Sequence, residues 1–329
     1  STGTITKNGA GTLTLSGANT TTGALTINGG SVVISSGGTL GGTQALTFGA
    51  ANAGGGTFNF NIASTAAVQS LGALSFLGGD GTVQSTYGSA TGNGGLTFAS
   101  LAARTAGATG NFIVSGGANG TTNSIKLTGQ TAASPLVLLD PGFFFGGSSY
   151  AVIDATTANL VRAPVYGDGT TGDGTNFVTN AGGTSITGTS TVNYQVTGSL
   201  SAQATTSFNT LQISGASAVN VAQAASSTLT LTKGGILRSG GGASTISGAT
   251  LSPTNNEFIV RTDSAADSLT ISSVLAPGGG TTVLTKTGAG TLTLSGTNTF
   301  TGNIFINGDR KSTRLNSSHE WISRMPSSA

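Results

Sequence analysis

Apolar and hydroxyl residues alternate along most of this chain. In the stretch Thr12–Leu15 each leucine follows a threonine. A period of two predicts a half-buried β-strand with its aliphatic side chains facing a core and its threonines facing outward. Glycine and asparagine, which suit turns, separate the strands. The alternation recurs at Leu13/Leu15, Leu25/Ile27, Val32/Ile34, Leu46/Phe48, Phe58/Phe60/Ile62, Leu74/Phe76, Leu96/Phe98, Ile125/Leu127, Val192/Tyr194/Val196, Leu211/Ile213, Leu229/Leu231, Phe258/Val260, Leu269/Ile271 and Leu292/Leu294.

One unit of this pattern occurs twice, at residues 6–29 and 285–308, with 18 of 24 aligned positions identical. Each copy reads as strand, glycine turn, strand, glycine turn, which predicts one coil of an all-β parallel β-solenoid rather than a self-sufficient domain. The second copy has a further apolar strand, in which Ile304 and Ile306 are expected to face inward. The residues that define the repeat are Gly9, Gly11, Leu13, Leu15, Gly17, Asn19, Gly23 and Ile27, and their counterparts Gly288, Gly290, Leu292, Leu294, Gly296, Asn298, Gly302 and Ile306.

We see no boundary between independent cores, so residues 1–308 are predicted to form one continuous stack in which like residues of successive coils form rows. At about 20–25 residues per coil this gives about 12–15 coils. A strand spacing of about 4.8 Å then predicts a rod about 60–70 Å long with an unpaired sheet edge at each end.

The repeat GAGTLTLSGTNTFTGN, followed by an apolar strand and NG, resembles the passenger-associated β-strand repeat of bacterial autotransporter passengers. The resemblance covers about 48 residues, and it implies a right-handed parallel β-helix. It also implies export through the outer membrane by a C-terminal translocator barrel, which would lie outside this sequence, and no particular ligand. The first copy departs from the pattern at Thr21, where the second has Phe300, so a ring stacked at that turn is not expected there.

Composition changes the picture mainly at the C-terminus. Glycine makes up 55 of 329 residues and charged residues only 7%, with no cysteine, which favours ordered β structure over disorder and excludes disulfides. Residues 309–329 lack glycine and hold the only His, Trp and Met. They also hold four of the 12 basic and two of the 10 acidic residues, so the net charge of +2 belongs to this tail.

The tail is interpreted as non-native. Its first four residues back-translate to the start of a common short-read sequencing adapter, and the alternative is a basic C-terminal extension. The rest of the chain is neutral, so nucleic acid is not an expected partner. With neither an export signal nor a long apolar span in the sequence, we expect a fragment that does not itself span a membrane.

The chain is poor in catalytic groups. Residues 1–308 contain no His and no Cys, which excludes His-based acid–base catalysis, Ser-His-Asp and Cys-His nucleophiles, and imidazole metal sites. We therefore predict no enzyme activity, no cofactor and no metal. The acidic residues are expected to be mostly scattered singly: Asp80, Asp140, Asp154, Asp168, Asp173, Glu257, Asp263 and Asp267.

Three smaller patterns carry weaker predictions. Asp168 and Asp173 in GDGTTGDG suggest a calcium loop, but solvated turns fit better because calcium needs six to eight oxygens. The segment 263–267 is expected to be a turn that blunts a sheet edge. Lys7 and Lys286 recur at equivalent positions and are expected to be exposed charges that keep a strand edge soluble.

The middle of the chain is less regular. Residues 135–150, PLVLLDPGFFFGGSSY, predict a core strand, a turn and then an aromatic plug over an irregular coil. A surface-exposed hydrophobic contact site is the alternative. Residues 163–176 have the composition of a loop.

The most probable role from the sequence is a non-catalytic structural stalk, exported to the cell surface or secreted, with adhesion to a host, matrix or polysaccharide surface. The second hypothesis is a solenoid that binds ice or polysaccharide through outward threonine rows on one face. The third is a polysaccharide-cleaving β-helix, which requires two or three acids to converge in one groove. The threonines of the second hypothesis are Thr12, Thr14, Thr228, Thr230, Thr232, Thr291 and Thr293.

Overall fold

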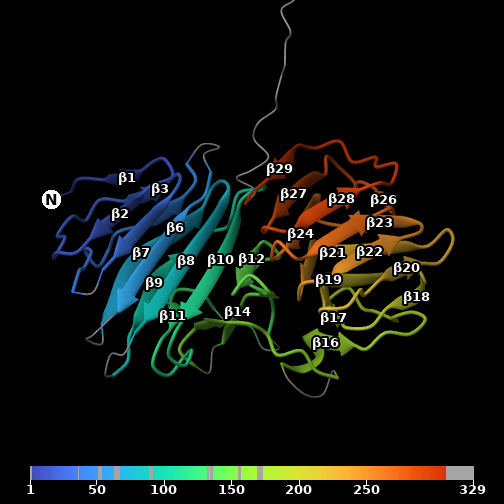
Figure 1. Cartoon of the computed structure of the whole chain (residues 1–329), viewed down its shortest axis with the longest axis horizontal. Helices are drawn as coiled ribbons and strands as arrows, with labels where there is room; N and C mark the ends of the chain where they lie inside the picture. The colour runs from blue at the N-terminus through green and yellow to red at the C-terminus, as the bar shows by residue number, and fades with distance from the viewer. Residues whose placement is uncertain are drawn as a thin grey trace, which may run out of the picture.

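The structure is a computed structural model, and it describes residues 2–35, 37–50, 54–62, 67–88, 92–131, 133, 136–154, 157–168 and 173–308. Over these residues it is a parallel β-solenoid without an α-helix, as the alternating pattern predicts. The chain forms two stacks of coils, here called the first arm and the second arm, which lie side by side (Figure 1). The composition of residues 163–176 predicts a loop, and their described part contains only an isolated bridge at Gly167 and a short 3-10 helix.

The first arm has an eight-stranded and a seven-stranded sheet, and each coil contributes one strand to each. Its strands are β1 (Ile5–Lys7), β2 (Thr12–Leu15), β3 (Leu25–Ile27), β4 (Ser31–Ile34), β5 (Leu46–Phe48), β6 (Thr57–Ile62), β7 (Val68–Phe76), β8 (Asp80–Tyr87), β9 (Gly95–Leu101), β10 (Thr109–Ser115), β11 (Ile125–Leu127), β12 (Phe143–Phe145), β13 (Ser149–Tyr150), β14 (Val152–Asp154) and β15 (Leu160–Arg162).

The second arm repeats this plan with a nine-stranded and a five-stranded sheet. Its elements are the 3-10 helix η2 (Gly174–Asn176) and β16 (Phe177–Asn180), β17 (Asn193–Val196), β18 (Leu200–Gln203), β19 (Thr206–Ser214), β20 (Val221–Gln223), β21 (Thr228–Ser239), β22 (Ala243–Ser247), β23 (Thr250–Pro253), β24 (Glu257–Thr262), β25 (Ser268–Ile271), β26 (Val274–Leu275), β27 (Val283–Thr287), β28 (Thr291–Leu294) and β29 (Ile304–Ile306).

The coils are fewer and more variable in length than the sequence predicts. Paired residues are 20 positions apart at Ile5 and Leu25 but 28 apart at Leu46 and Leu74. About ten coils form in total, in place of the expected 12–15. The difference arises because several coils are longer than assumed and because the middle of the chain does not continue the parallel stack.

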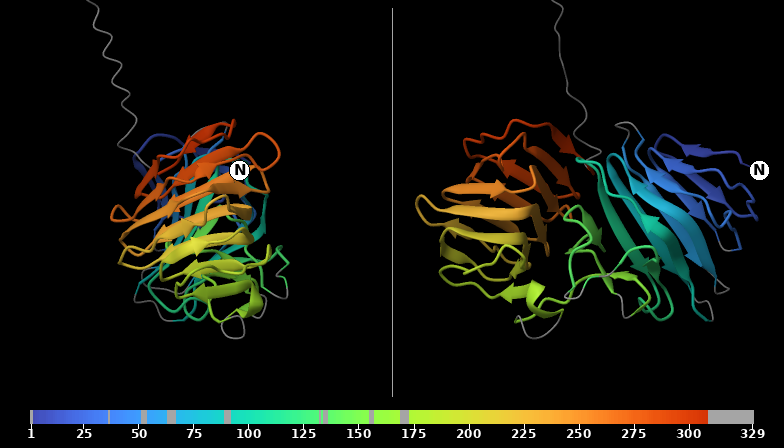
Figure 2. Two further views of the ribbon diagram at one scale, coloured as in Figure 1. Left: turned by 90° about the vertical axis from the view of Figure 1, so that its right-hand side faces the viewer. Right: turned by 180° about the vertical axis from the view of Figure 1, so that it is seen from behind.

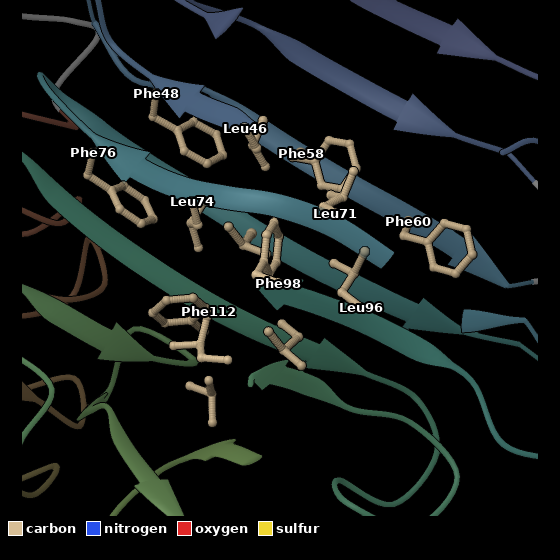
Figure 3. Packing of buried hydrophobic residues seen from close by; sticks show 14 of the residues in the cluster. Leu46, Phe48, Phe58, Phe60, Leu71, Leu74, Phe76, Leu96, Phe98 and Phe112 are labelled. Atoms are coloured by element: carbon tan, nitrogen blue, oxygen red, sulfur yellow. The ribbon is translucent and has the colours of Figure 1, made fainter. Parts of the chain in front are cut away.

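The core of each arm consists of rows of inward side chains, as predicted. Figure 3 shows Phe48 and Phe76 of adjacent coils, whose rings stack with centroids 5.1 Å apart. Leu46 pairs with Leu74 two register positions away, so leucine lies on leucine and phenylalanine on phenylalanine. Full burial of such side chains stabilises each by about 1.5–3 kcal/mol relative to exposure.

The prediction of one uninterrupted core is wrong, because the buried hydrophobic residues fall into two large clusters, one per arm. At the end of the first arm, β13, β14 and β15 pair antiparallel instead of parallel. An antiparallel ending interrupts the parallel stack and covers its edge. The chain then starts a second stack, which runs back alongside the first, so the protein is a folded-back pair rather than a single rod (Figure 2).

The aromatic segment ends the first arm and faces the second. Phe143–Phe145 form strand β12, and Phe143 packs on Phe76 and Phe112 in the core. Phe144 is fully buried against the second arm, so the surface-contact alternative is wrong. The predicted core strand before it is also wrong: residues 136–139 form no strand, and Val137 is 47% exposed. Pro135 and residues 309–329, the tail interpreted as adapter sequence, lie outside the described residues.

Within the described part of the chain, no helix has the length and apolar character needed to cross a membrane.

Candidate functional site

The two copies of the repeat form the outermost coils of the two arms. Strand β2 is the last strand of its sheet in the first arm, and β28 is the last strand of its sheet in the second. Their leucines are therefore only half-buried, since each has a neighbouring coil on one side. Strand β29 also ends its sheet, and Ile304 and Ile306 are 57% and 63% exposed. Ile304 pairs with the core residue Leu284, and both isoleucines line the open end of this core beside Leu292 and Leu294, so they face inward as predicted. They are more exposed than expected because no further coil of the described chain covers them.

Glycine is needed where one coil lies on another. A Cβ atom at Gly290 would lie 2.3 Å from the carbonyl oxygen of Asp267 in the coil before it. At the equivalent Gly11 no atom lies within 4 Å, because no coil of the described chain precedes it. Gly23 and Gly302 both follow a complete coil, and in both copies a Cβ would meet a carbonyl oxygen at 2.3–2.4 Å. The same comparison holds for the pairs Gly9/Gly288 and Gly17/Gly296, of which only the second-copy members contact a preceding coil.

The repeated lysine, predicted as an exposed charge that keeps a strand edge soluble, fastens the glycine turn that follows it. The ammonium group of Lys286 donates to the carbonyl oxygens of Thr287 and Gly288 at 2.8 and 2.7 Å, and this side chain is buried. Lys7 does the same for the next two residues of its own copy, at 2.7 Å each. The prediction is therefore wrong for Lys286, which is buried, whereas Lys7 stays partly exposed on the edge strand β1.

The repeated asparagines form hydrogen bonds between coils. The side chain of Asn19 donates to the carbonyls of Gly17 and Thr39 at 2.8 and 3.0 Å. In the second copy the side-chain oxygen of Asn298 accepts from the amide of Leu275 at 3.0 Å. The position that differs between copies also differs in contacts: Phe300 packs against the core of the second arm, whereas the hydroxyl of Thr21 accepts from a glutamine amide.

The candidate threonines lie on three different sheets. Thr12 and Thr14 are on β2 in the seven-stranded sheet of the first arm, and Thr291 and Thr293 are on β28 in the five-stranded sheet of the second. Thr228, Thr230 and Thr232 are on β21 in the nine-stranded sheet. The single binding face that the second hypothesis requires is therefore not present. Each set instead joins a short hydroxyl row of its own sheet, such as Thr245–Thr270–Thr293.

An apolar contact joins the two arms. Phe144 and Tyr150 from the end of the first arm pack on Leu237 and Ile259, which lie on the outer face of the second arm. Strand β24 is consequently buried at every residue, because one face meets its own core and the other meets the first arm. We call this contact, together with the ion pairs around it, the joint.

Two arginines reinforce the joint with buried ion pairs. Arg104 of the first arm donates to both carboxylate oxygens of Glu257 in the second, at 3.2 and 2.7 Å, and also bonds Asp140. Burial lowers the pKa of Arg104, but the neighbouring carboxylates outweigh this effect and raise its pKa above the ordinary value. The guanidinium therefore stays charged within the joint.

The second arginine reaches across the joint from the second arm to the first. Arg261 of the second arm donates through Nε to the carbonyl of Gly147 at 2.8 Å and stacks 4.8 Å from the centre of the Phe144 ring. Its guanidinium also lies 3.0 Å from Asp263 and 3.6 Å from Asp80 of the first arm. Four of the acids expected to be scattered thus gather at the joint, each beside an arginine.

A family profile, the passenger-associated-transport-repeat, matches residues 5–34 and 284–308. Both copies of the repeat are therefore similar to this family of repeats. Together with the β-solenoid they fit an autotransporter passenger domain with β-strand repeats. Searches of curated proteins and of solved structures gave no match.

The acids outside the joint are also paired or hydrogen-bonded, as Asp173 shows. Asp173 is not a solvated turn residue: both of its carboxylate oxygens accept from Arg162, at 2.6 and 2.7 Å, and one accepts from the amide of Val165. Arg162 also bonds Asp154 at 2.9 Å. Among the described residues no group of three or more potential protein ligands is placed to hold a metal ion.

Because of Asp173, the free energy of unfolding should depend on pH in the acidic range. Burial favours its neutral form, but the hydrogen bonds from Arg162 and Val165 outweigh burial and lower its pKa. A lowered folded-state pKa stabilises the fold above the ordinary aspartate pKa, about 3.9, and that stability is lost as pH falls through the folded value. We expect Asp173→Asn to destabilise the protein at pH 7 and much less at pH 3, measured by urea unfolding. An equal loss at both pH values would contradict the ionic role.

The turn at 263–267 lies within the stack and not at an edge, which corrects its prediction. Asp267 is 1% exposed and accepts from the amide and hydroxyl of Ser264, at 2.9 and 2.7 Å. It also accepts from the amide of Gly241 in the preceding coil at 2.7 Å. Strand β25, which follows the turn, has a neighbour on both sides in its sheet. This aspartate therefore holds two neighbouring coils of the second arm together.

Proposed function

We propose that this chain is a non-catalytic structural stalk of an exported protein that is displayed on the cell surface or secreted. One observation carries the proposal: the matches to the passenger-associated-transport-repeat coincide with the outer coil of each arm of an all-β solenoid. Such repeats belong to passenger regions, so the family supports export. In a solenoid each coil contacts mainly its neighbours, and length is gained by adding coils without a new core.

The chemistry of the joint supports a structural rather than a catalytic role. A glycoside-cleaving pair needs one accessible carboxylic acid and one accessible carboxylate on either side of a sugar ring. Glu257 has only 8% of its side chain exposed, and it is fully engaged with Arg104, the amide of Gly107 and the hydroxyl of Thr285. Carboxylates neutralised in this way stabilise the arms and are poorly placed to attack a substrate.

Adhesion to a host, matrix or polysaccharide surface is the finer part of the proposal. Turns and loops project from both arms, and a stalk places such loops away from the membrane that anchors it. The threonine sets are on three sheets, so they support such contact weakly.

Surface display tests the proposal directly. The chain would be placed between an export signal and the translocator domain of a characterised autotransporter in a Gram-negative host. We expect folded chain outside the cell, seen as protease-accessible protein on intact cells that is cleaved at few sites. Cells displaying the translocator alone are the control. Retention of the chain inside the cell, or release of reducing ends from added polysaccharides, would contradict an exported non-catalytic stalk.

A further inference from the structure

A cleft of about 550 Å³ opens beside the second arm, where the connecting segment from the first arm passes it. One wall is apolar and consists of Val137 and Leu138. The other wall carries amides and hydroxyls from successive coils of the second arm: Asn176, Ser190, Thr191, Asn209, Thr232 and Lys233. Its volume lies within the range of about 300–1,000 Å³ that is usual for small-molecule sites.

A β-bulge shapes the polar wall. Phe208 pairs with Leu231 but Thr210 pairs with Gly235, so the three residues 232–234 of β21 lie opposite the single residue Asn209 of β19. A bulge redirects side chains out of the regular alternation, and bulges are frequent beside functional sites. Here it directs Thr232 and Lys233 to the cleft beside Asn209.

Hydrogen bonds hold the polar wall in place. The side chain of Asn209 donates to Asn193 at 2.8 Å, and its oxygen accepts from the hydroxyl of Thr232 at 3.1 Å. The same hydroxyl lies 2.7 Å from the carbonyl oxygen of Ser190, so its one proton is shared between these two acceptors. At the other end, Asn176 donates to the carbonyl of Leu136 at 3.0 Å, which ties the connecting segment to the second arm. The site is therefore formed before a ligand arrives, which lowers the entropic cost of binding.

The charged residues that line the cleft indicate which class of ligand fits it. No acidic side chain is among the residues that line it, and Lys233 is exposed there. Within the described chain the arginines Arg104, Arg162, Arg238 and Arg261 have carboxylate partners, whereas no ion pair involves Lys233. A single lysine matches a single carboxylate. A phosphate would favour an arginine fork or a helix N-terminus, and an amino acid would require an acidic partner for its ammonium group.

We propose that this cleft binds an acidic saccharide, with a uronate carboxylate at Lys233. The C–H face of a sugar ring would lie on Val137 and Leu138, and its hydroxyls would bond to Asn209 and its neighbours. The proposal names a ligand class for the adhesion proposed above, but it does not depend on the stalk function, because export and structural support require no ligand.

Calorimetric titration of the full chain tests this with two probes, tetragalacturonate and the neutral maltotetraose. We expect binding of the acidic probe and at least about tenfold weaker binding of the neutral one, the loss expected when one charged partner is missing. Lys233→Gln should weaken the acidic probe by about tenfold or more. Val137→Asp should weaken it further, since it adds a like charge and removes the apolar contact.

A matched control separates the site from general charge attraction. Lys126→Gln removes one positive charge from the first arm, on strand β11, away from the cleft. It should leave the affinity for tetragalacturonate unchanged, and circular dichroism should show that all variants fold. The proposal is overturned if tetragalacturonate does not bind at millimolar concentration. Equal effects of the two lysine substitutions, or equal binding of both probes, would overturn it as well.

Discussion

Glu257→Ala should lower the free energy of unfolding by about 3–5 kcal/mol, the usual cost of removing one partner from a buried ion pair. The substitution leaves the guanidinium of Arg104 buried beside Asp140 alone, and it leaves the amide of Gly107 and the hydroxyl of Thr285 without their acceptor. Because Arg104 and Glu257 belong to different arms, the loss should also loosen the joint. Urea unfolding measures the first effect, and an increased radius of gyration in X-ray scattering measures the second.

A control outside the joint makes this result specific. Asp154→Ala also removes a carboxylate from an arginine, but Arg162 keeps its two bonds to Asp173 and lies within one arm. It should cost only about 1 kcal/mol and leave the radius of gyration unchanged. If Glu257→Ala changed neither stability nor radius, the ion pairs would not hold the arms together.

Gly290→Ala should destabilise the protein by about 3 kcal/mol, while Gly11→Ala should change stability by less than about 0.5 kcal/mol. The two glycines occupy the same position of the repeat, and the local sequence around them is nearly identical. They differ only in what precedes them: the added methyl at Gly290 meets two carbonyl oxygens at 2.3 and 2.5 Å, and at Gly11 it meets nothing within 4 Å.

This comparison holds local conformation constant. Neither glycine has the positive φ that would itself penalise alanine, so the difference in unfolding free energy reports the coil-on-coil contact. Gly302→Ala and Gly23→Ala form a second pair and should both be costly, since both positions contact a preceding coil. Equal costs at Gly290 and Gly11 would show that glycine is required by the turn and not by stacking.

The sequence predicts the repeating parts of this fold well because their rule is local. Alternation at Leu46/Phe48 or Leu269/Ile271 identifies a strand and its inward face, and both pairs are fully buried in the structure. The glycine turns and the asparagine bonds between coils follow for the same reason. Each of these features depends only on residues of the same coil or of the coil next to it.

The joint could not be predicted in this way because it brings together residues of different arms. A signal for it exists in β24, where Phe258, Ile259 and Val260 form an unbroken apolar run instead of an alternation. Such runs are typical of strands buried on both faces. The consecutive Ile236 and Leu237 of β21 give the same signal, and Leu237 and Ile259 are the residues that meet the first arm. The periodicity of the sequence does not indicate which part of the chain covers the outer face of these strands.

The residues of the joint are far apart in the sequence, and this separation indicates when the joint forms during folding. Parallel strands of neighbouring coils pair residues 16–33 positions apart, whereas the joint connects Arg104 with Glu257 over 153 positions and Gly107 with Asn307 over 200. Closing a longer loop costs more chain entropy, and contacts distant in sequence slow folding. Each arm can therefore grow coil by coil before the joint closes, and the closure of the joint is the last step. Until then the outer face of β24 and the ring of Phe144 are in water, and this apolar surface stays exposed for as long as the second arm is incomplete.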